Sequence, residues 1–172
     1  MKKSILIAFM TTFITTSMMF CSCNNSVDDE QLTTMEVKFN VTHSNNFSYV
    51  TTENSKRTLA ETYEIILDDL STYEKISDKF MDKYEAEELE KSDIPLETDE
   101  KGNRRVSPSY IQSCMSITAE NKTEVLKVQA TNKAPQIAAD ICNYITEVAP
   151  DILSRVTKDA SIEVMGEPTI VN

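Results

Sequence analysis

The sequence predicts an α+β protein with the ferredoxin-like element order β-α-β-β-α-β, in which a sheet of about four strands packs with helices. Apolar and polar residues alternate over 35–42 and again over 115–130, as in strands that bury one face. Apolar residues recur every three or four positions over 59–84 and 137–148, as in amphipathic helices. The chain order of these patterns indicates the fold.

The first 23 residues have the composition of a membrane-targeting or membrane-anchoring segment. A positive start precedes an uncharged, mostly apolar stretch, and acidic residues follow soon after Cys23. The Ser22–Cys23 junction is similar to a bacterial lipoprotein cleavage site. Residues 1–23 are therefore predicted to be a lipoprotein signal, with Cys23 lipidated, or a single-span anchor; a cleaved secretion signal is the third alternative. Each places the domain outside the cytoplasm, after a linker at 24–33.

The first predicted strand alternates Met35, Val37, Phe39 and Val41 with polar residues, so these four are expected in the core. A polar stretch follows, beginning at His43, which is the only histidine in the chain. No partner lies at metal-ligand spacing from it. We therefore interpret His43 as a loop residue, and no metal-ligating residue is predicted.

Two helices are predicted next. Asn54 or Ser55 caps the first, which presents one apolar stripe: Leu59, Tyr63, Ile66 and Leu70. The sequence from Ser71 to Glu74 has the capping-box pattern and predicts the start of the second. Its expected core stripe is Tyr73, Ile76 and Phe80, with Tyr84 as a further member.

The stretch 85–106 is the least regular part of the chain and is rich in carboxylates. Their spacing lacks the Asp/Asn-Gly geometry of a calcium loop, so a solvated acidic insertion is expected here. Within it, 99–105 has the composition of an exposed turn.

The second half begins with a short helix from Ser107–Pro108 to about Ser113, because proline favours the first helical position. A hairpin is expected next, with a tight turn at 120–122. Its two strands are expected to bury alternate residues: Met115, Ile117 and Ala119, then Leu126, Val128 and Ala130.

Pro135 opens the longest predicted helix, and Pro150 should kink or end it, with a further turn over 151–156. The apolar stripe of this helix is Ile137, Ile141, Tyr144, Ile145 and Val148. Ile162 and Val164 predict a final strand.

The charge and composition argue against several functions. The formal net charge of −11 disfavours binding to nucleic acid. No nucleophile–base pair, metal cluster or phosphate loop is apparent, so no catalytic residue and no cofactor are predicted. Adjacent carboxylates such as Asp68 and Asp69 point in different directions from a helix, which makes a hydrolase or transferase the least supported class. Cys114 and Cys142 form either a disulfide or two separate, half-buried thiols.

Several short sequences, in order, resemble the extracytoplasmic domain of the polysaccharide co-polymerases, the Wzz-type chain-length determinants and capsular polysaccharide biosynthesis adaptors. They are LAETY at 59–63 with Ile66–Leu67, SITAE at 116–120, TEVLKV at 123–128, PQIAADICN at 135–143 and the exit strand at 161–168. On this resemblance, 34–172 is taken as one domain with an acidic insertion near 85–106.

The resemblance implies a non-catalytic, membrane-anchored module at the extracytoplasmic face of a bacterial membrane. Such a module would regulate chain length or export in capsular or exopolysaccharide biosynthesis by oligomeric scaffolding. The implied partners are further copies, full-length co-polymerase relatives and the polysaccharide polymerase machinery. Relatives carry a second transmembrane helix after the exit strand, so we expect either a stand-alone accessory version or a fragment. The alternative function is a surface lipoprotein that uses this fold to bind a protein or glycan.

Overall fold

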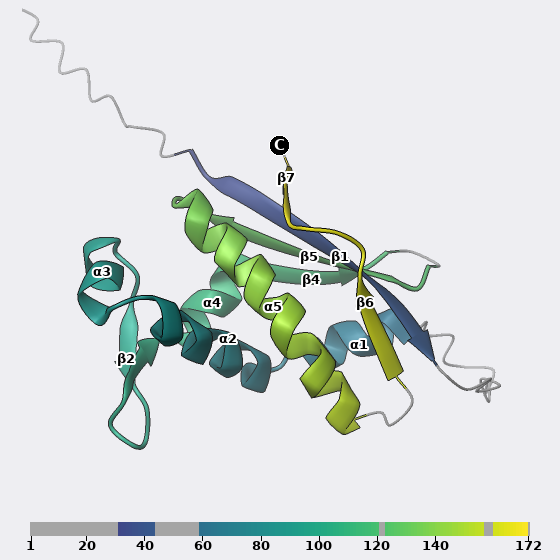
Figure 1. Cartoon of the computed structure of the whole chain (residues 1–172), viewed down its shortest axis with the longest axis horizontal. Coiled ribbons are helices and arrows are strands. Elements are labelled where there is room, and N and C mark those ends of the chain that lie inside the picture. The colour runs from purple at the N-terminus through teal and green to yellow at the C-terminus, as the bar shows by residue number, and fades with distance from the viewer. Residues whose placement is uncertain (1–30, 44–58, 121–122, 157–159, 172) are drawn as a thin grey trace, which may run out of the picture.

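A computed structural model describes residues 31–43, 59–120, 123–156 and 160–171. These residues form an antiparallel sheet packed against helices (Figure 1), which confirms the predicted α+β class.

The main sheet is built around the first strand. β1 (Thr33–His43) pairs with β5 (Val125–Asn132) on one side, and with β6 (Ala160–Val164) and β7 (Thr169–Val171) on the other. β4 (Met115–Ala119) lies on the far side of β5, so the order is β4-β5-β1-β6, with every pairing antiparallel. The described chain carries more elements than β-α-β-β-α-β, so the ferredoxin-like order stays a prediction.

The alternation in β1 places its four apolar side chains in the core, as predicted: Met35, Val37, Phe39 and Val41 are all buried. The register sets Val37 beside Val128 and Phe39 beside Leu126, so both strands bury the same face. The opposite face carries polar side chains such as Glu36 and Lys38. The interpretation of His43 as a loop residue is wrong for the backbone, because His43 ends β1 and pairs with Ala160.

The helices cover the apolar face of this sheet. α5 (Pro135–Val156) contacts β1, β5 and β6, and α1 (Leu59–Leu67) contacts β4 and β5. α2 (Leu70–Lys83) packs against α5 and against the short α4 (Pro108–Cys114). Figure 1 shows α5 running across the strands, with α1 and α2 joined end to end.

The start of α2 differs from the prediction. Its N-cap is Asp69, whose Oδ1 accepts the Ser71 N–H at 2.9 Å, so the helix begins before the expected capping box. Leu70 is 58% exposed and does not extend the stripe of α1. Tyr73, Ile76 and Phe80 are buried as expected. Asn54 and Ser55, the expected caps of the first helix, lie outside the described residues.

α5 buries its predicted stripe and continues through Pro150 to Val156, so the helix does not end at the proline. Its buried face is wider than predicted and also includes Ala138, Asp140, Cys142, Ala149, Ile152 and Leu153.

The acidic stretch is ordered, which the sequence did not predict. It contains α3 (Ala86–Lys91) and a hairpin of β2 (Leu96–Thr98) and β3 (Arg104–Val106). The hairpin turn uses Gly102 at a φ of 85°, a conformation that glycine adopts without steric cost. Many of the carboxylates stay at the surface, but three apolar side chains join the core: Leu89, Ile94 and Val106.

Candidate functional site

The outer edge of β4 is partly closed by hydrogen bonds to its neighbours. In an antiparallel ladder, the backbone groups of alternate residues point toward the paired strand and the others point away. Glu120 donates its N–H to the carbonyl of Val125 at 2.9 Å, so the N–H of Ala119 points outward. The Oε2 of Glu64, on α1, accepts that N–H at 2.9 Å. At the other end of β4, Met115 donates its N–H to Gln112 as the cap of α4.

The edge formed by β6 is different. Met165 donates its N–H to the carbonyl of Lys38 at 2.8 Å, so the alternation turns the backbone groups of Ile162 and Val164 away from β1. Within the described ranges, no group is hydrogen-bonded to these outward N–H and C=O groups. β6 therefore presents an open strand edge, whereas two of the three outward N–H groups of β4, those of Met115 and Ala119, are already bonded. We call the edge of β4 the closed edge on this account.

Exposed apolar side chains lie at several points along this side of the sheet. Val156, at the end of α5, is 59% exposed, and α5 packs beside β6. The others follow in β6, just after it and in β7: Val164, Met165 and Ile170, which are 40%, 57% and 63% exposed. We name these four residues, with the outward backbone of β6, the open edge. Exposed apolar groups beside an unpaired strand are typical of an interaction surface.

The most buried carboxylate in the described structure belongs to Asp140, on α5. Its two oxygens each accept a hydrogen bond from Lys83 Nζ, at 2.8 and 2.7 Å. They also accept hydrogen bonds from the Tyr84 hydroxyl at 2.5 Å and from Nε2 of Gln136 at 2.9 Å. The hydrogen bond to Asp140 raises the pKa of Lys83. Because the carboxylate is fully paired, we interpret this cluster as a brace between α2 and α5 rather than a reactive group.

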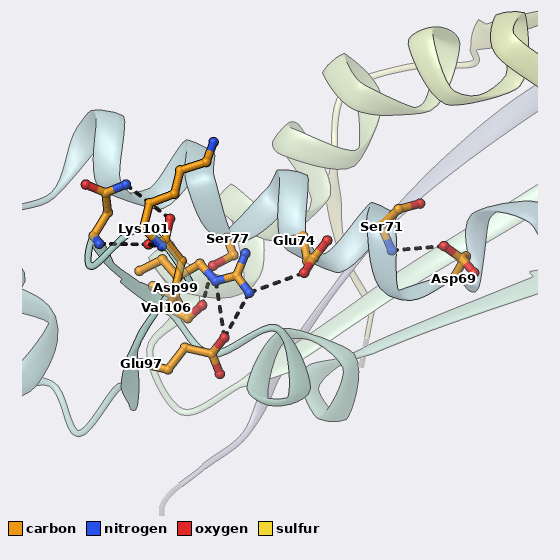
Figure 2. A network of polar contacts seen from close by, with 10 residues as sticks. Asp69, Ser71, Glu74, Ser77, Glu97, Asp99, Lys101 and Val106 are labelled. Atoms are coloured by element: carbon orange, nitrogen blue, oxygen red, sulfur yellow. Dashed lines mark hydrogen bonds and ion pairs between the residues drawn. The ribbon is translucent and has the colours of Figure 1, made fainter.

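A second polar cluster fixes the acidic hairpin on α2. Arg105, on β3, contacts Glu97 on β2 at 3.0 Å and Glu74 on α2 at 3.2 Å. The Ser77 hydroxyl bonds the carbonyl of Val106 in the same region. Figure 2 shows this network, with Glu74 and Glu97 brought together from elements far apart in the sequence. The carboxylates here therefore hold the hairpin in place.

A polar hollow of about 490 Å³ lies where α3, α4 and β5 meet. Asn132 is buried there and donates its Nδ2 to the Tyr110 hydroxyl at 2.7 Å, while its Oδ1 accepts the Ala134 N–H at 3.0 Å. These bonds join the end of β5 to the start of α5, so the polar groups of Asn132 have a structural role.

The two described cysteines are free thiols, so the disulfide alternative is not formed in this structure. Cys114 is half-buried and lines the hollow beside Asn132. Cys142 is buried, and burial raises the pKa of its thiol to about 12. A thiol with so high a pKa stays protonated and unreactive at neutral pH.

The lipidation candidate, Cys23, lies outside the described residues. Among the residues that are described, no group of three or more His, Cys, Asp and Glu side chains is arranged to hold a metal ion. In the same ranges, every helix is too short or too polar to cross a membrane.

The fold and its edges define an α+β domain with one closed and one open sheet edge. No model of a known protein family matches the chain, and a comparison with curated proteins gives no significant match.

Proposed function

We propose that the chain is a membrane-anchored, non-catalytic assembly module similar to the polysaccharide co-polymerases. It acts at the extracytoplasmic face of a bacterial membrane and helps to regulate chain length or export in capsular or exopolysaccharide biosynthesis. The structural observation that supports this proposal is the contrast between the closed edge at β4 and the open edge at β6.

Scaffolding requires a surface on which a neighbouring subunit docks. An unpaired strand with exposed apolar side chains is a liability for a protein that works alone, and proteins commonly cover or charge such an edge. The contact between Glu64 and Ala119 protects one edge of this sheet in that way. The other edge keeps Ile170 and Met165 in contact with solvent, as expected of a surface that a partner covers.

The proposed partners are further copies of the chain, full-length co-polymerase relatives and the polysaccharide polymerase machinery. Residues 1–23, with lipidation at Cys23, supply the proposed anchor. Two acyl chains on one cysteine suffice for stable attachment, because each buried methylene contributes about 0.8 kcal/mol.

The test is to extract the tagged full chain from membranes with mild detergent after co-expression with its genomic neighbours. We expect the chain to co-purify with a two-span co-polymerase. We also expect deletion of the chain's own gene to change the length distribution of a surface polysaccharide. Recovery without such a partner, together with an unchanged polymer, would overturn the proposal.

A matched pair of variants tests whether the partner binds at the open edge. Ile170→Asp charges an exposed apolar residue on β7, whereas Ile65→Asp makes the same change on α1, where the side chain is 54% exposed. We expect Ile170→Asp to lose the partner and Ile65→Asp to retain it. Equal behaviour of the two variants would contradict a role for the open edge.

A further inference from the structure

We infer that β6 of one copy pairs antiparallel with β6 of a second copy around a two-fold axis, with Ile162 opposite Ile162 of the second copy. The inference rests on the assembly role proposed above, since it takes a further copy of the chain, one of the proposed partners, as the partner of β6. The first argument is the backbone. Outward N–H and C=O groups on β6 lack a partner among the described residues, and an identical edge offers the complementary groups in antiparallel order.

The closed edge selects this arrangement over a head-to-tail one. If β6 of one copy paired with β4 of the next, each contact would leave a further free edge, and a ring or filament would grow. That contact is disfavoured because two of the three outward N–H groups of β4 are already bonded, that of Ala119 to Glu64 and that of Met115 to Gln112. The remaining partner for the edge of β6 is β6 of a second copy.

Strand length and charge fix the register. Pairing Ile162 with Ile162 aligns all five residues of β6 with the five of the second copy. It places Ile162 and Val164, whose backbone groups point outward, in hydrogen-bonded pairs. Ser161 then lies opposite Glu163 of the second copy, where a hydroxyl can bond a carboxylate. A shift that brought Glu163 opposite Glu163 would set like charges in the closest kind of antiparallel pair, which is unfavourable.

This arrangement also covers apolar surface. A two-fold axis perpendicular to the sheet keeps the helices of both copies on one side. Ile162 and Val164 lie on that side, because they pair with Val41 and Phe39 of the buried face of β1. Val156, which ends α5 a few residues before β6 begins, is also exposed. Over 160–171 the chain has only two charged residues, Glu163 and Glu167, so the acidity of the whole chain is not concentrated at this contact.

The test uses the detergent-extracted full chain without other proteins. Sedimentation equilibrium should give a concentration-dependent dimer. Ser161→Glu puts a carboxylate opposite Glu163 in both symmetric pairs, which should weaken the dimer roughly tenfold. Ser116→Glu is the matched control, because Ser116 is also an exposed serine and lies on the same sheet face, in β4. It should leave the dimer unchanged, and the double variant Ser161→Glu/Glu163→Lys should restore it.

Disulfide trapping checks the register independently. In the inferred pairing, residues 161 and 163 of opposite copies form a non-hydrogen-bonded pair with Cα atoms about 4.5 Å apart, close enough for a disulfide. A mixture of Ser161→Cys and Glu163→Cys chains should cross-link on oxidation. Ser161→Cys alone should not cross-link through position 161.

A wild-type chain that stays monomeric at all concentrations would overturn the β6 dimer, and so would a dimer that Ser161→Glu and Ser116→Glu affect equally. Co-purification with a co-polymerase by a chain that is monomeric alone would reject only the β6 pairing. A β6 dimer with no effect on any polysaccharide would reject only the proposed function.

Discussion

Glu64 on α1 accepts the outward N–H of Ala119 on β4 at 2.9 Å, so a helix carboxylate occupies the position where a further strand would bond. Ala119 and Glu64 are 55 residues apart in sequence, and α1 packs along β4 to bring them together. One end of the β4 edge is therefore protected by the protein's own side chain.

Removing this acceptor should destabilise the protein and open the second edge. Glu64→Ala leaves the Ala119 N–H without its partner, which should lower the free energy of unfolding by about 1–2 kcal/mol. Urea unfolding measures that loss, and light scattering should show concentration-dependent association. Glu64→Gln keeps an acceptor oxygen and should remain close to wild type. Identical results for the Ala and Gln variants would show that the hydrogen bond does not close the edge.

The Asp140 brace should contribute strongly to stability. Asp140→Ala removes a carboxylate that is 3% exposed and leaves Lys83, Tyr84 and Gln136 without it. Breaking a fully buried ion pair costs about 3–5 kcal/mol. The Lys83 side chain is 45% exposed and returns to water, so we expect the free energy of unfolding to fall by a smaller amount, about 2 kcal/mol. Glu147→Ala, which breaks an exposed contact with Lys79, should leave the urea midpoint within error. Equal midpoints for both variants would contradict the brace.

The brace also has a pH dependence. The pKa of Lys83 is raised in the folded state, chiefly by its hydrogen bond to Asp140. Its contribution to stability is therefore complete below the unfolded pKa of about 10.4, and is lost as the pH rises through the folded pKa. In Asp140→Ala, the free energy of unfolding should therefore fall less as the pH rises. Urea unfolding of both proteins from pH 8 to 11 measures this difference.

A single glycine should stabilise the end of α3. Asp93 has a φ of 56°, and the N–H of Ile94 bonds the carbonyl of Leu89 at 3.0 Å, as in a Schellman cap. Asp93→Gly removes the left-handed strain at some cost in backbone entropy, so the free energy of unfolding should rise by about 0.5–1 kcal/mol. Ser92→Gly, at a φ of −95°, should instead lower it. Shifts of the same sign in thermal unfolding would refute this account.

The two described thiols should differ in reactivity. At pH 8, an alkylating reagent should label half-buried Cys114 well before buried Cys142, whose pKa is raised to about 12 by burial. Peptide mass spectrometry measures both rates, and urea should equalise them. Because the folded pKa is raised, the contribution of Cys142 to stability is present below its unfolded pKa of about 8.5 and is lost as the pH rises through about 12. Equal native labelling would contradict the burial.

Elements can be predicted from the sequence when their apolar pattern repeats several times. β1, the β4–β5 hairpin and α5 each repeat their apolar pattern long enough to be recognised. Their expected core residues are buried except Ala119, which is half-buried. The cap of α2 is missed because Asp69 and Ser71 are both good N-caps, and only the folded backbone chooses between them. Leu70 is exposed because it opens α2 instead of extending the stripe of α1.

Short elements escape the same reasoning. β2, β3 and β7 have three residues each, too few to display a period. In the acidic stretch, Leu89, Ile94 and Val106 are spaced irregularly and belong to different elements, so their shared burial has no sequence pattern. The open edge has a weak signal, the alternation of Ile162 and Val164. Whether a strand is central or outermost depends on the pairing, which the alternation alone does not give.

The central place of β1 constrains the time course of folding. This strand is made early, yet it acquires its neighbours β6 and β7 only after residues 160–171 have been synthesised, more than 100 residues later. Contacts so distant along the chain slow folding, because the intervening segment loses entropy before the pairing is formed. During synthesis one side of β1 therefore stays unpaired until residues 160–171 have been made, and the unfinished chain is prone to aggregation in that interval.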